Sequence, residues 1–386
     1  MDELTNPYRP GAGTLPPALI GRDEILRQFE ITLGRALAGR PGKSVMTVGL
    51  RGVGKTVLLN RFSVMAERQG FLVAFVEASD SGDFRTLLSV NLRKILIELD
   101  RGTVSRAVVK ALRVLKSFTL QLPDGSMIQL DPEPLFGEAD SGHLDEDLRD
   151  LLVAVGEAAR DRGRGILIAV DEVQYLSEIE LSALIVAVHR TTQLDLPLVL
   201  VGAGLPQLPG LAGEARSYSE RLFEFPEIGS LGENDARAVL AVPAEANGAE
   251  FTLAALDEMV RASQGYPYFL QEWGSHVWNH AADSPIPVED VAAVRPLVLS
   301  ALDRDFFRVR LDRLTPKERE YLRAMATLGP GPHRSGDIAA ELGVRVESVA
   351  PRRSALIKKG MIYSPAHGDT AFTVPLFDDI LRRVMP

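Results

Sequence analysis

Apolar and polar residues alternate along the first part of the chain with two different periods. Stretches in which apolar residues recur every three or four positions predict helices, and short, almost wholly apolar runs predict buried strands. The predicted helices cover residues 23–38, 55–69, 83–99, 144–161 and 179–192, and the predicted strands cover residues 44–50, 71–78, 165–172, 196–204 and 221–228. Because buried strands that alternate with helices are typical of parallel sheets, we expect an α/β fold with a doubly wound, five-stranded parallel sheet.

An insertion at about residues 101–142 interrupts this pattern. It contains the sequence FTLQLPDGSMIQLD, in which apolar and polar residues alternate around a Pro-Asp-Gly turn, and this predicts a β-hairpin. The apolar face of the hairpin would consist of Phe118, Leu120, Leu122, Ile128 and Leu130. Because an isolated hairpin is marginally stable in water, this face would either pack on the body of the protein or bind a protein partner.

The two ends of the chain differ from the predicted core, which covers residues 19–230. Residues 231–303 read as several helices interrupted by prolines and glycines, and we interpret them as a helical lid domain. Residues 304–386 predict three helices followed by two short strands, which is the order of a winged helix-turn-helix domain. Residues 1–18 contain four prolines and few apolar residues, so we expect an extended segment that does not pack as an element.

The first predicted strand leads directly into a glycine-rich loop. Its sequence GLRGVGKT, residues 49–56, fits the pattern G-x-x-x-x-G-K-[ST]. Glycines let the backbone bend so that successive N–H groups converge on a phosphate at the positive end of a helix dipole. Lys55 would reach the β- and γ-phosphates, and the Thr56 hydroxyl would bind Mg²⁺. The predicted phosphate site consists of Gly49, Gly52, Val53, Gly54, Lys55, Thr56 and Val57.

Two carboxylates follow the buried run ILIAV. They are Asp171 and Glu172, and carboxylates at this place are costly unless they have charged partners. Asp171 would hold Mg²⁺, and Glu172 would orient or deprotonate an attacking water molecule. The alternative is a solvated strand end without a catalytic role.

These motifs resemble the AAA+ superfamily, in particular the branch that includes replication initiators of the origin-recognition type and STAND signalling ATPases. The segment LIGRDEIL, with Gly21 and Arg22, is similar to the signature that lines the adenine side of the site in that branch. The segment QGYPYF resembles the G-x-P motif of the lid, in which Pro267 would pack near the base. The resemblance implies ATP and Mg²⁺ as ligands and ATP hydrolysis as the activity.

The resemblance also has gaps. In the family a polar sensor residue ends the strand after the strand with the two carboxylates, but Gly202, Ala203 and Gly204 stand at that place here. Tyr268 replaces the arginine that often follows the lid proline. The departures favour slow turnover and a switch over a fast motor.

An arginine finger is implied by the segment SYSERLFEF. In the family such an arginine acts on the nucleotide of a neighbouring subunit, so its presence would imply a homo-oligomer. Arg221 is the candidate and Arg216 its reserve. A surface arginine paired with Glu220 or Glu224 is the alternative.

The charge of the chain is divided unevenly. Residues 304–386 hold 15 Lys and Arg against 10 Asp and Glu, a net charge of +5, whereas the whole chain has a net charge of −9. We expect the third helix of the winged helix to present Arg352, Arg353, Lys358 and Lys359 outward to double-stranded DNA. Exposed basic residues also form solvated faces, and winged helices also bind proteins.

We therefore expect an ATP-dependent, DNA-associated regulatory ATPase. A STAND-like signalling ATPase whose C-terminal module binds protein is the alternative from another class, and a nucleotide-binding scaffold that does not hydrolyse ATP is a third. No apolar run approaches the roughly 20 residues of a membrane-spanning helix. The first residues do not follow the pattern of an export signal, so we expect a cytoplasmic protein. The chain has no cysteine, which excludes disulfides and cysteine nucleophiles.

Overall fold

The described residues pack into two compact units. The computed structural model describes residues 1–11, 13–40, 42–79, 82–101, 105–120, 133–135, 137–366, 368–374 and 376–384. We call residues 22–48 and 58–227 the sheet unit, and residues 1–21, 49–57 and 228–386 the lid unit. The glycine-rich loop therefore packs with the lid unit, although it directly follows a strand of the sheet unit.

A five-stranded parallel sheet forms the centre of the sheet unit. Its strands are β1 (Ser44–Val48), β2 (Phe71–Glu77), β3 (Gly165–Asp171), β4 (Leu198–Gly204) and β5 (Phe223–Glu224), in the order β2-β3-β4-β1-β5. Val48 at the end of β1 is paired with Gly204, and Val170 is paired with Gly202, so these strands end at the same edge. Every residue of β1, β3 and β4 is buried, as expected of strands covered on both faces. The predicted fold class is confirmed.

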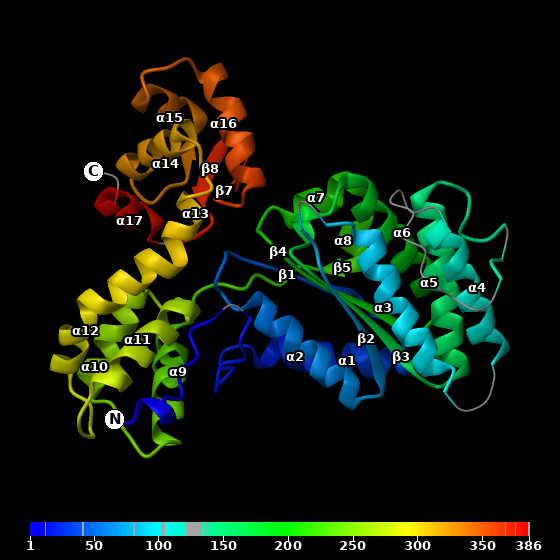
Figure 1. Ribbon diagram of the computed structural model, residues 1–386, viewed down its shortest axis with the longest axis horizontal. Helices are drawn as coiled ribbons and strands as arrows, with labels where there is room; N and C mark the ends of the chain where they lie inside the picture. The colour runs from blue at the N-terminus through cyan, green and yellow to red at the C-terminus, as the bar shows by residue number, and fades with distance from the viewer. Residues whose placement is uncertain are drawn as a thin grey trace. The chain divides into compact units, whose positions relative to one another are not determined.

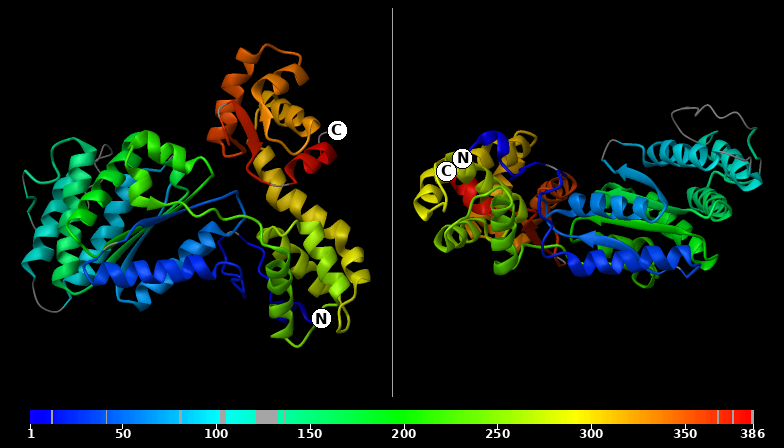
Figure 2. Two further views of the ribbon diagram at one scale, coloured as in Figure 1. Left: turned by 180° about the vertical axis from the view of Figure 1, so that it is seen from behind. Right: turned by 90° about the horizontal axis from the view of Figure 1, so that it is seen from below.

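Helices cover both sides of this sheet. They are α1 (Asp23–Leu37), α2 (Lys55–Arg68), α3 (Phe84–Leu99), α4 (Arg106–Leu120), α5 (Leu144–Asp161), η2 (Val173–Tyr175), α6 (Glu178–Gln193), α7 (Leu208–Ala215) and α8 (Ser219–Leu222). The rings of Phe29 and Phe62 join α1 to α2, with centroids 4.2 Å apart. These two helices lie on one side of the sheet, and α4, α5 and α6 lie on the other (Figures 1 and 2).

Helix α4 occupies part of the segment for which the sequence predicted a β-hairpin. Phe118 and Leu120 belong to its last turn, so the prediction that a strand begins at Phe118 is wrong. Apolar residues recur with the helical period over the whole of α4, and this longer pattern outweighs the short alternation of FTLQL. Leu122, Ile128, Leu130 and the Pro-Asp-Gly turn lie outside the described residues.

The lid unit is mainly helical. Its elements are η1 (Glu3–Thr5), α9 (Glu233–Glu245), α10 (Leu253–Ser263), α11 (Pro267–His280), α12 (Val288–Ala301), the π-helical segment η3 (Leu302–Arg308), α13 (Val309–Leu311), α14 (Pro316–Leu328), β6 (His333–Arg334), α15 (Ser335–Glu341), α16 (Val346–Lys358), β7 (Ile362–Tyr363), β8 (Asp369–Phe372) and α17 (Phe377–Val384). None of the helices in the described part of the chain is both long and apolar enough to span a bilayer.

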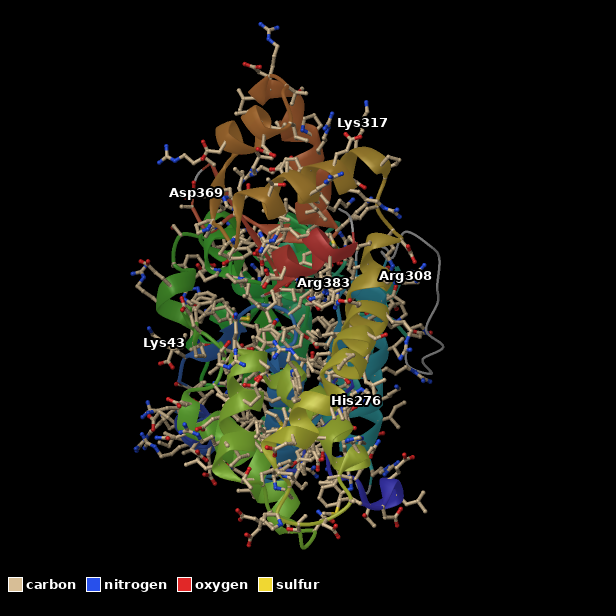
Figure 3. All side chains as sticks on the ribbon, turned by 90° about the vertical axis from the view of Figure 1, so that its left-hand side faces the viewer. Lys43, His276, Arg308, Lys317, Asp369 and Arg383 are labelled. Atoms are coloured by element: carbon tan, nitrogen blue, oxygen red, sulfur yellow. The ribbon has the colours of Figure 1, made fainter. Side chains whose placement is uncertain are left out.

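Residues 304–386, which we call the C-terminal domain, contain the three helices and two strands that the sequence predicted there, together with β6 and α17. Strands β6, β8 and β7 form a small antiparallel sheet. The predicted capping box at the start of α14 is present, because Thr315 and Glu318 cap each other's backbone. Arg383 of α17, which is labelled in Figure 3, donates a hydrogen bond to Asp303 of η3 at 2.6 Å and so joins the last helix to the segment at the start of the domain.

The N-terminal segment packs against the helices of the lid unit. Tyr8 is only 4% exposed, and its hydroxyl donates to the carbonyl oxygen of Leu240. A Cβ atom at Gly274 would lie 2.6 Å from the Tyr8 ring, so the glycine opens the slot that the ring fills. Trp278 also donates to the carbonyl oxygen of Asp2 at 3.0 Å. Apart from η1, the described residues of this segment form no helix or strand, as expected of an extended segment. The expectation that it does not pack is wrong, because one aromatic side chain with a matching slot is enough to hold it.

Candidate nucleotide site

The loop between β1 and α2 has a backbone that depends on its glycines. Gly52 and Gly54 adopt φ angles of +83° and +94°, which side chains other than hydrogen disfavour. A Cβ atom at Gly49 would lie 2.1 Å from the carbonyl oxygen of Ile228, so no larger residue fits there. The spacing of the three glycines thus sets both the bend and the close approach of this loop to the rest of the lid unit.

Lys55 is held over this loop. Its ammonium nitrogen donates to the carbonyl oxygens of Gly49 at 3.0 Å and Leu50 at 2.8 Å, and the residue is only 7% exposed. Val53 is buried, and Thr56 and Val57 are half-buried at the start of α2. The predicted phosphate-binding residues therefore lie in one short loop and the first turn of one helix, and the Lys55 ammonium is held over the loop.

Gly21 and Pro267, two of the residues predicted on the adenine side, lie in a cluster that reaches this loop. Gly21, with φ +74°, packs against Leu231, because a Cβ atom there would be 3.1 Å from the Leu231 side chain. The N–H of Leu231 donates to the carbonyl oxygen of Gly265 at 2.9 Å. Tyr266 follows, and Pro267 begins α11. The lid motif and Gly21 are thus brought together in the lid unit, whereas Arg22 precedes α1 in the sheet unit.

Two tyrosines connect the lid motif to the loop. A Cβ atom at Gly52 would lie 3.0 Å from the ring of Tyr266 and 3.3 Å from Cβ of Tyr268. The backbone N–H of Tyr268 donates to the carbonyl oxygen of Gly52 at 3.3 Å, and its hydroxyl donates to Glu272 at 2.9 Å. Burial raises the pKa of the Tyr266 hydroxyl, so this group stays neutral. The start of α11 therefore covers one side of the glycine-rich loop.

Arg51 and Arg310 were not predicted as part of the site. Arg51 occupies a position of the loop motif at which any residue is allowed. Its Nε donates to the carbonyl oxygen of Gly360 at 3.2 Å, and its backbone N–H donates to the carbonyl oxygen of Thr373 at 3.0 Å. Burial, and next the charge of Arg51, lower the pKa of Arg310 to about 10. Two guanidinium groups therefore lie beside the loop. No sequence pattern indicates this, because their contacts join residues that are hundreds of positions apart.

Asp171 and Glu172 end β3 in the sheet unit. Asp171 is 5% exposed, and its carboxylate accepts the backbone N–H of Glu172 at 2.8 Å. Glu172 has φ +52° and ψ +41°, a left-handed conformation that costs a residue with a side chain about 1 kcal/mol. Such strain is typical of functional sites, because the surrounding structure must hold the residue in place.

The end of β4 has no room for a polar side chain. A Cβ atom at Gly202 would lie 2.2 Å from the sulfur of Met46, and one at Gly204 would lie 2.8 Å from the Leu208 side chain. The missing polar sensor residue at the end of β4, which the sequence indicated, thus has a steric cause.

The candidate arginine finger and its reserve differ in their contacts. Arg216 forms an ion pair with Asp145 at 3.1 Å. Arg221 is exposed in α8, and among the described residues its guanidinium has no hydrogen bond or ion pair, including with Glu220 or Glu224.

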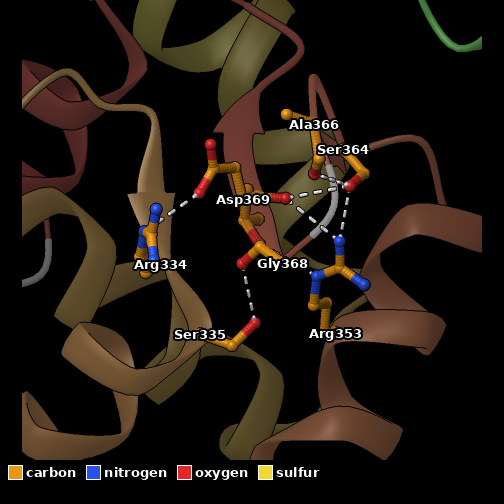
Figure 4. A network of polar contacts seen from close by, with 8 residues as sticks. Arg334, Ser335, Arg353, Ser364, Ala366, Gly368 and Asp369 are labelled. Carbon is orange, nitrogen blue, oxygen red and sulfur yellow. Dashed lines mark hydrogen bonds and ion pairs between the residues drawn. The ribbon is translucent and has the colours of Figure 1, made fainter.

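Three of the four basic residues predicted to face DNA, Arg352, Arg353 and Lys359, contact other residues of the C-terminal domain. Arg353 donates to Ser364 at 2.7 Å and to Thr370 at 3.0 Å, which ties α16 to the strands (Figure 4). Lys359 donates to Glu318 at 2.7 Å. The expectation that Arg353 points outward is wrong, because the pattern of a helix cannot show which polar partners the next strands bring. Arg352 lies 3.8 Å from Glu320 with 19% of its side chain exposed, and Lys358 is exposed.

A parallel sheet whose first strand runs into a loop of the form G-x-x-x-x-G-K-[ST] is the fold of a P-loop NTPase. Residues 18–201 match the family described as AAA ATPase domain, in agreement with the resemblance of the motifs to AAA+ P-loop ATPases. Residues 304–381 match a domain of unknown function, DUF8462. Comparison with curated proteins gave no match.

Several solved structures are similar to the whole chain. A Walker-type ATPase of Pyrococcus abyssi has 19% sequence identity and a TM-score of 0.56, with 97% of this chain and 98% of that chain covered. The RuvB Holliday junction branch migration motor of Thermotoga maritima has 17% identity and a TM-score of 0.47, with coverage of 91% and 92%. The ORC1 protein of Aeropyrum pernix, solved in complex with DNA, has 15% identity and a TM-score of 0.45, with coverage of 96% and 94%. The first of these likenesses shows the fold.

Proposed function

We propose that this protein is an ATP-hydrolysing switch that passes the state of its nucleotide to its C-terminal domain, a winged helix. The contact of Arg51 with Gly360 and Thr373 supports this proposal most directly, because it joins the phosphate loop to that domain without an intermediary. A loop that rearranges around a phosphate must alter these two hydrogen bonds, and the domain would respond.

The side chains of the site fit a magnesium-bound triphosphate. The N–H groups of the loop and the ammonium of Lys55 would hold the phosphates. The Thr56 hydroxyl and the Asp171 carboxylate are oxygen donors, which Mg²⁺ prefers, and bound Mg²⁺ neutralises charge on the phosphate oxygens. Glu172 would orient the attacking water and accept its proton. We propose slow turnover, since the end of β4 offers no polar sensor side chain.

Phosphate release, measured with and without Mg²⁺, tests the proposed activity. Glu172→Gln should abolish release and leave the affinity for ATP within about twofold, because the amide cannot accept the proton. A wild-type protein without magnesium-dependent ATP binding would refute the proposal. If Glu172→Gln leaves phosphate release unchanged in an active protein, the turnover does not depend on this carboxylate.

We further propose that the C-terminal domain binds double-stranded DNA. Its net charge of +5 and the exposed Lys358 at the end of α16 support this. A salt titration of DNA affinity should be linear on a log-log plot, and Lys358→Ala should reduce the slope by about 1, which is the effect of losing one phosphate contact. Lys43→Ala, in the sheet unit, is the matched control. No DNA affinity at low salt would favour a protein-binding domain of the STAND type, in which the segment at residues 101–142 would be a second docking surface.

We also propose that Arg221 acts on the nucleotide of a neighbouring copy. Its exposure supports this, as does the lack of a guanidinium partner among the described residues. Mixing Arg221→Ala with Lys55→Ala should restore part of the activity, because a mixed assembly can hold one intact site. Two inactive variants that stay inactive when mixed would contradict the proposal.

A further inference from the structure

Gln174 lies between the end of β3, which carries Asp171 and Glu172, and the end of β4, which has no polar sensor side chain. It belongs to the short helical turn η2, directly after Glu172 and Val173. Its side-chain Oε1 accepts the backbone N–H of Leu205, the residue after β4, at 3.0 Å. Its Nε2 donates to Oε2 of Glu172. One amide side chain therefore links the carboxylate after β3 to the main chain after β4.

The neighbouring residues are shaped to admit this side chain. A Cβ atom at Gly204 would lie 3.0 Å from Oε1 of Gln174, so a larger residue at the end of β4 would press on the amide. The two hydrogen bonds also fix which end of the amide is oxygen, since Leu205 offers only a donor and the Glu172 carboxylate only acceptors. The glycine that leaves the sensor strand without a side chain thus makes space for a polar group from η2.

The link constrains a carboxylate that has little freedom already. Glu172 is in the left-handed conformation, so its backbone direction is set, and the bond from Gln174 then selects one orientation of its carboxyl group. One oxygen of this carboxylate is therefore engaged by the amide of Gln174. In hydrolysis the water oxygen would bond to the γ-phosphorus, the bond to the β–γ bridging oxygen would break, and the proton of the water would pass to Glu172.

We propose that Gln174 is a positioning residue for Glu172 and supplies, from η2, the polar link between these strand ends that the side chains of β4 do not provide. This inference rests on the proposed ATPase activity. It predicts that the role of Gln174 lies in the chemical step and not in nucleotide affinity, because its side chain bonds the water-activating carboxylate and not the phosphate loop.

Gln174→Glu is the sharpest variant. It keeps the size of the side chain and an acceptor for Leu205, but it replaces the donor to Glu172 by a second carboxylate. We expect kcat to fall roughly 10- to 100-fold, the range that misplacement of a reacting group produces, while KM and the affinity for a fluorescent ATP analogue change less than about twofold. Gln193→Glu, at an exposed position of α6, is the matched control and should keep the wild-type kcat.

Further measurements separate positioning from folding and from failure of the proposed function. Gln174→Met, which loses both bonds without adding charge, should show the same loss of kcat, and thermal melting checks its fold. In the Glu172→Gln background, Gln174→Glu should cause no further loss in single-turnover rate, because the group that it positions is already inactive. An unchanged kcat in both Gln174 variants, or an equal loss of kcat and ATP affinity, would overturn the inference and leave the ATPase intact. A wild-type protein without ATPase activity would instead refute the proposed function, and the inference with it.

Discussion

Replacing Arg51 by alanine tests whether the phosphate loop and the C-terminal domain are coupled. The substitution keeps the hydrogen bond from the backbone N–H to Thr373 and removes the bond from Nε to Gly360. A hydrogen bond from a charged donor contributes about 1.5–3 kcal/mol. An opposing term comes from Arg310, because loss of the Arg51 charge relieves the repulsion that, after burial, lowers the Arg310 pKa to about 10. We expect a net loss of about 1 kcal/mol, which is roughly a fivefold change in the local opening equilibrium.

Hydrogen exchange of the segment between Gly360 and Thr373 measures this change. In Arg51→Ala its exchange should be about five times faster, since exchange follows the local opening equilibrium. Arg51→Lys, which keeps the charge but not the planar donor, should lie between the variant and the wild type. Arg40→Ala, an exposed position in the sheet unit, is the control. The reasoning fails if exchange in this segment is unchanged, or if it rises equally in every segment, since the latter indicates general destabilisation.

Three other predictions follow from the described contacts. Lys55→Ala should weaken ATP binding by at least tenfold in equilibrium titration, because a charge-assisted bond to phosphate is lost, whereas the exposed Lys43→Ala should not. Tyr8→Ala should lower the free energy of unfolding by about 3–5 kcal/mol and Tyr8→Phe by about 1 kcal/mol, as measured by urea denaturation; equal losses would show that the ring does not contribute by packing. Burial raises the pKa of Glu318, but hydrogen bonds from Lys359 and from the helix start outweigh this, and the net pKa is lowered. An ionised carboxylate with a lowered pKa stabilises the folded state above its ordinary pKa, and this stability is lost as the pH falls through the folded pKa. Melting of Glu318→Gln should therefore depend less on pH in the acid range than melting of the wild type.

The sheet and the phosphate loop were predictable because their signals are local. A buried strand appears in the sequence as an uninterrupted apolar run, and the glycines of the loop are required by a backbone bend within a few residues. Helix α5 begins and ends where its periodicity predicted, at Leu144 and Asp161. The misassigned hairpin had a local signal too, but FTLQL is too short to distinguish a strand from the last turn of a helix whose apolar residues begin far upstream.

Other features depend on residues that are distant in the sequence. Tyr8 is buried because Gly274 leaves a slot for its ring, and nothing near Tyr8 indicates that slot. Arg353 lies on a helix where the pattern predicts exposure, but Thr370 offers it a partner. The role proposed for Gln174 also depends on a distant segment, because its side-chain oxygen accepts a hydrogen bond from the main chain after β4. The sequence therefore identifies the groups that contact phosphate, whereas the groups that orient them become visible only when the elements are assembled.

The lid unit contains a second connection between the phosphate loop and the C-terminal domain. Beyond the tyrosine ring that packs on Gly52, aromatic rings follow one another with centroids 4.9 to 6.4 Å apart: Tyr266, Phe269, Phe307, Phe377 and Phe372. Such contact does not by itself establish coupling, which requires an element with two arrangements that both ends bias. The substitution Arg51→Ala separates the two connections, because it removes the contact of the guanidinium with the C-terminal domain and leaves the row of rings unchanged. If ATP alters exchange between Gly360 and Thr373 in the wild type but not in Arg51→Ala, the guanidinium carries the signal. If ATP has the same effect in both proteins, the signal must pass through packing, because the rings are unchanged by the substitution.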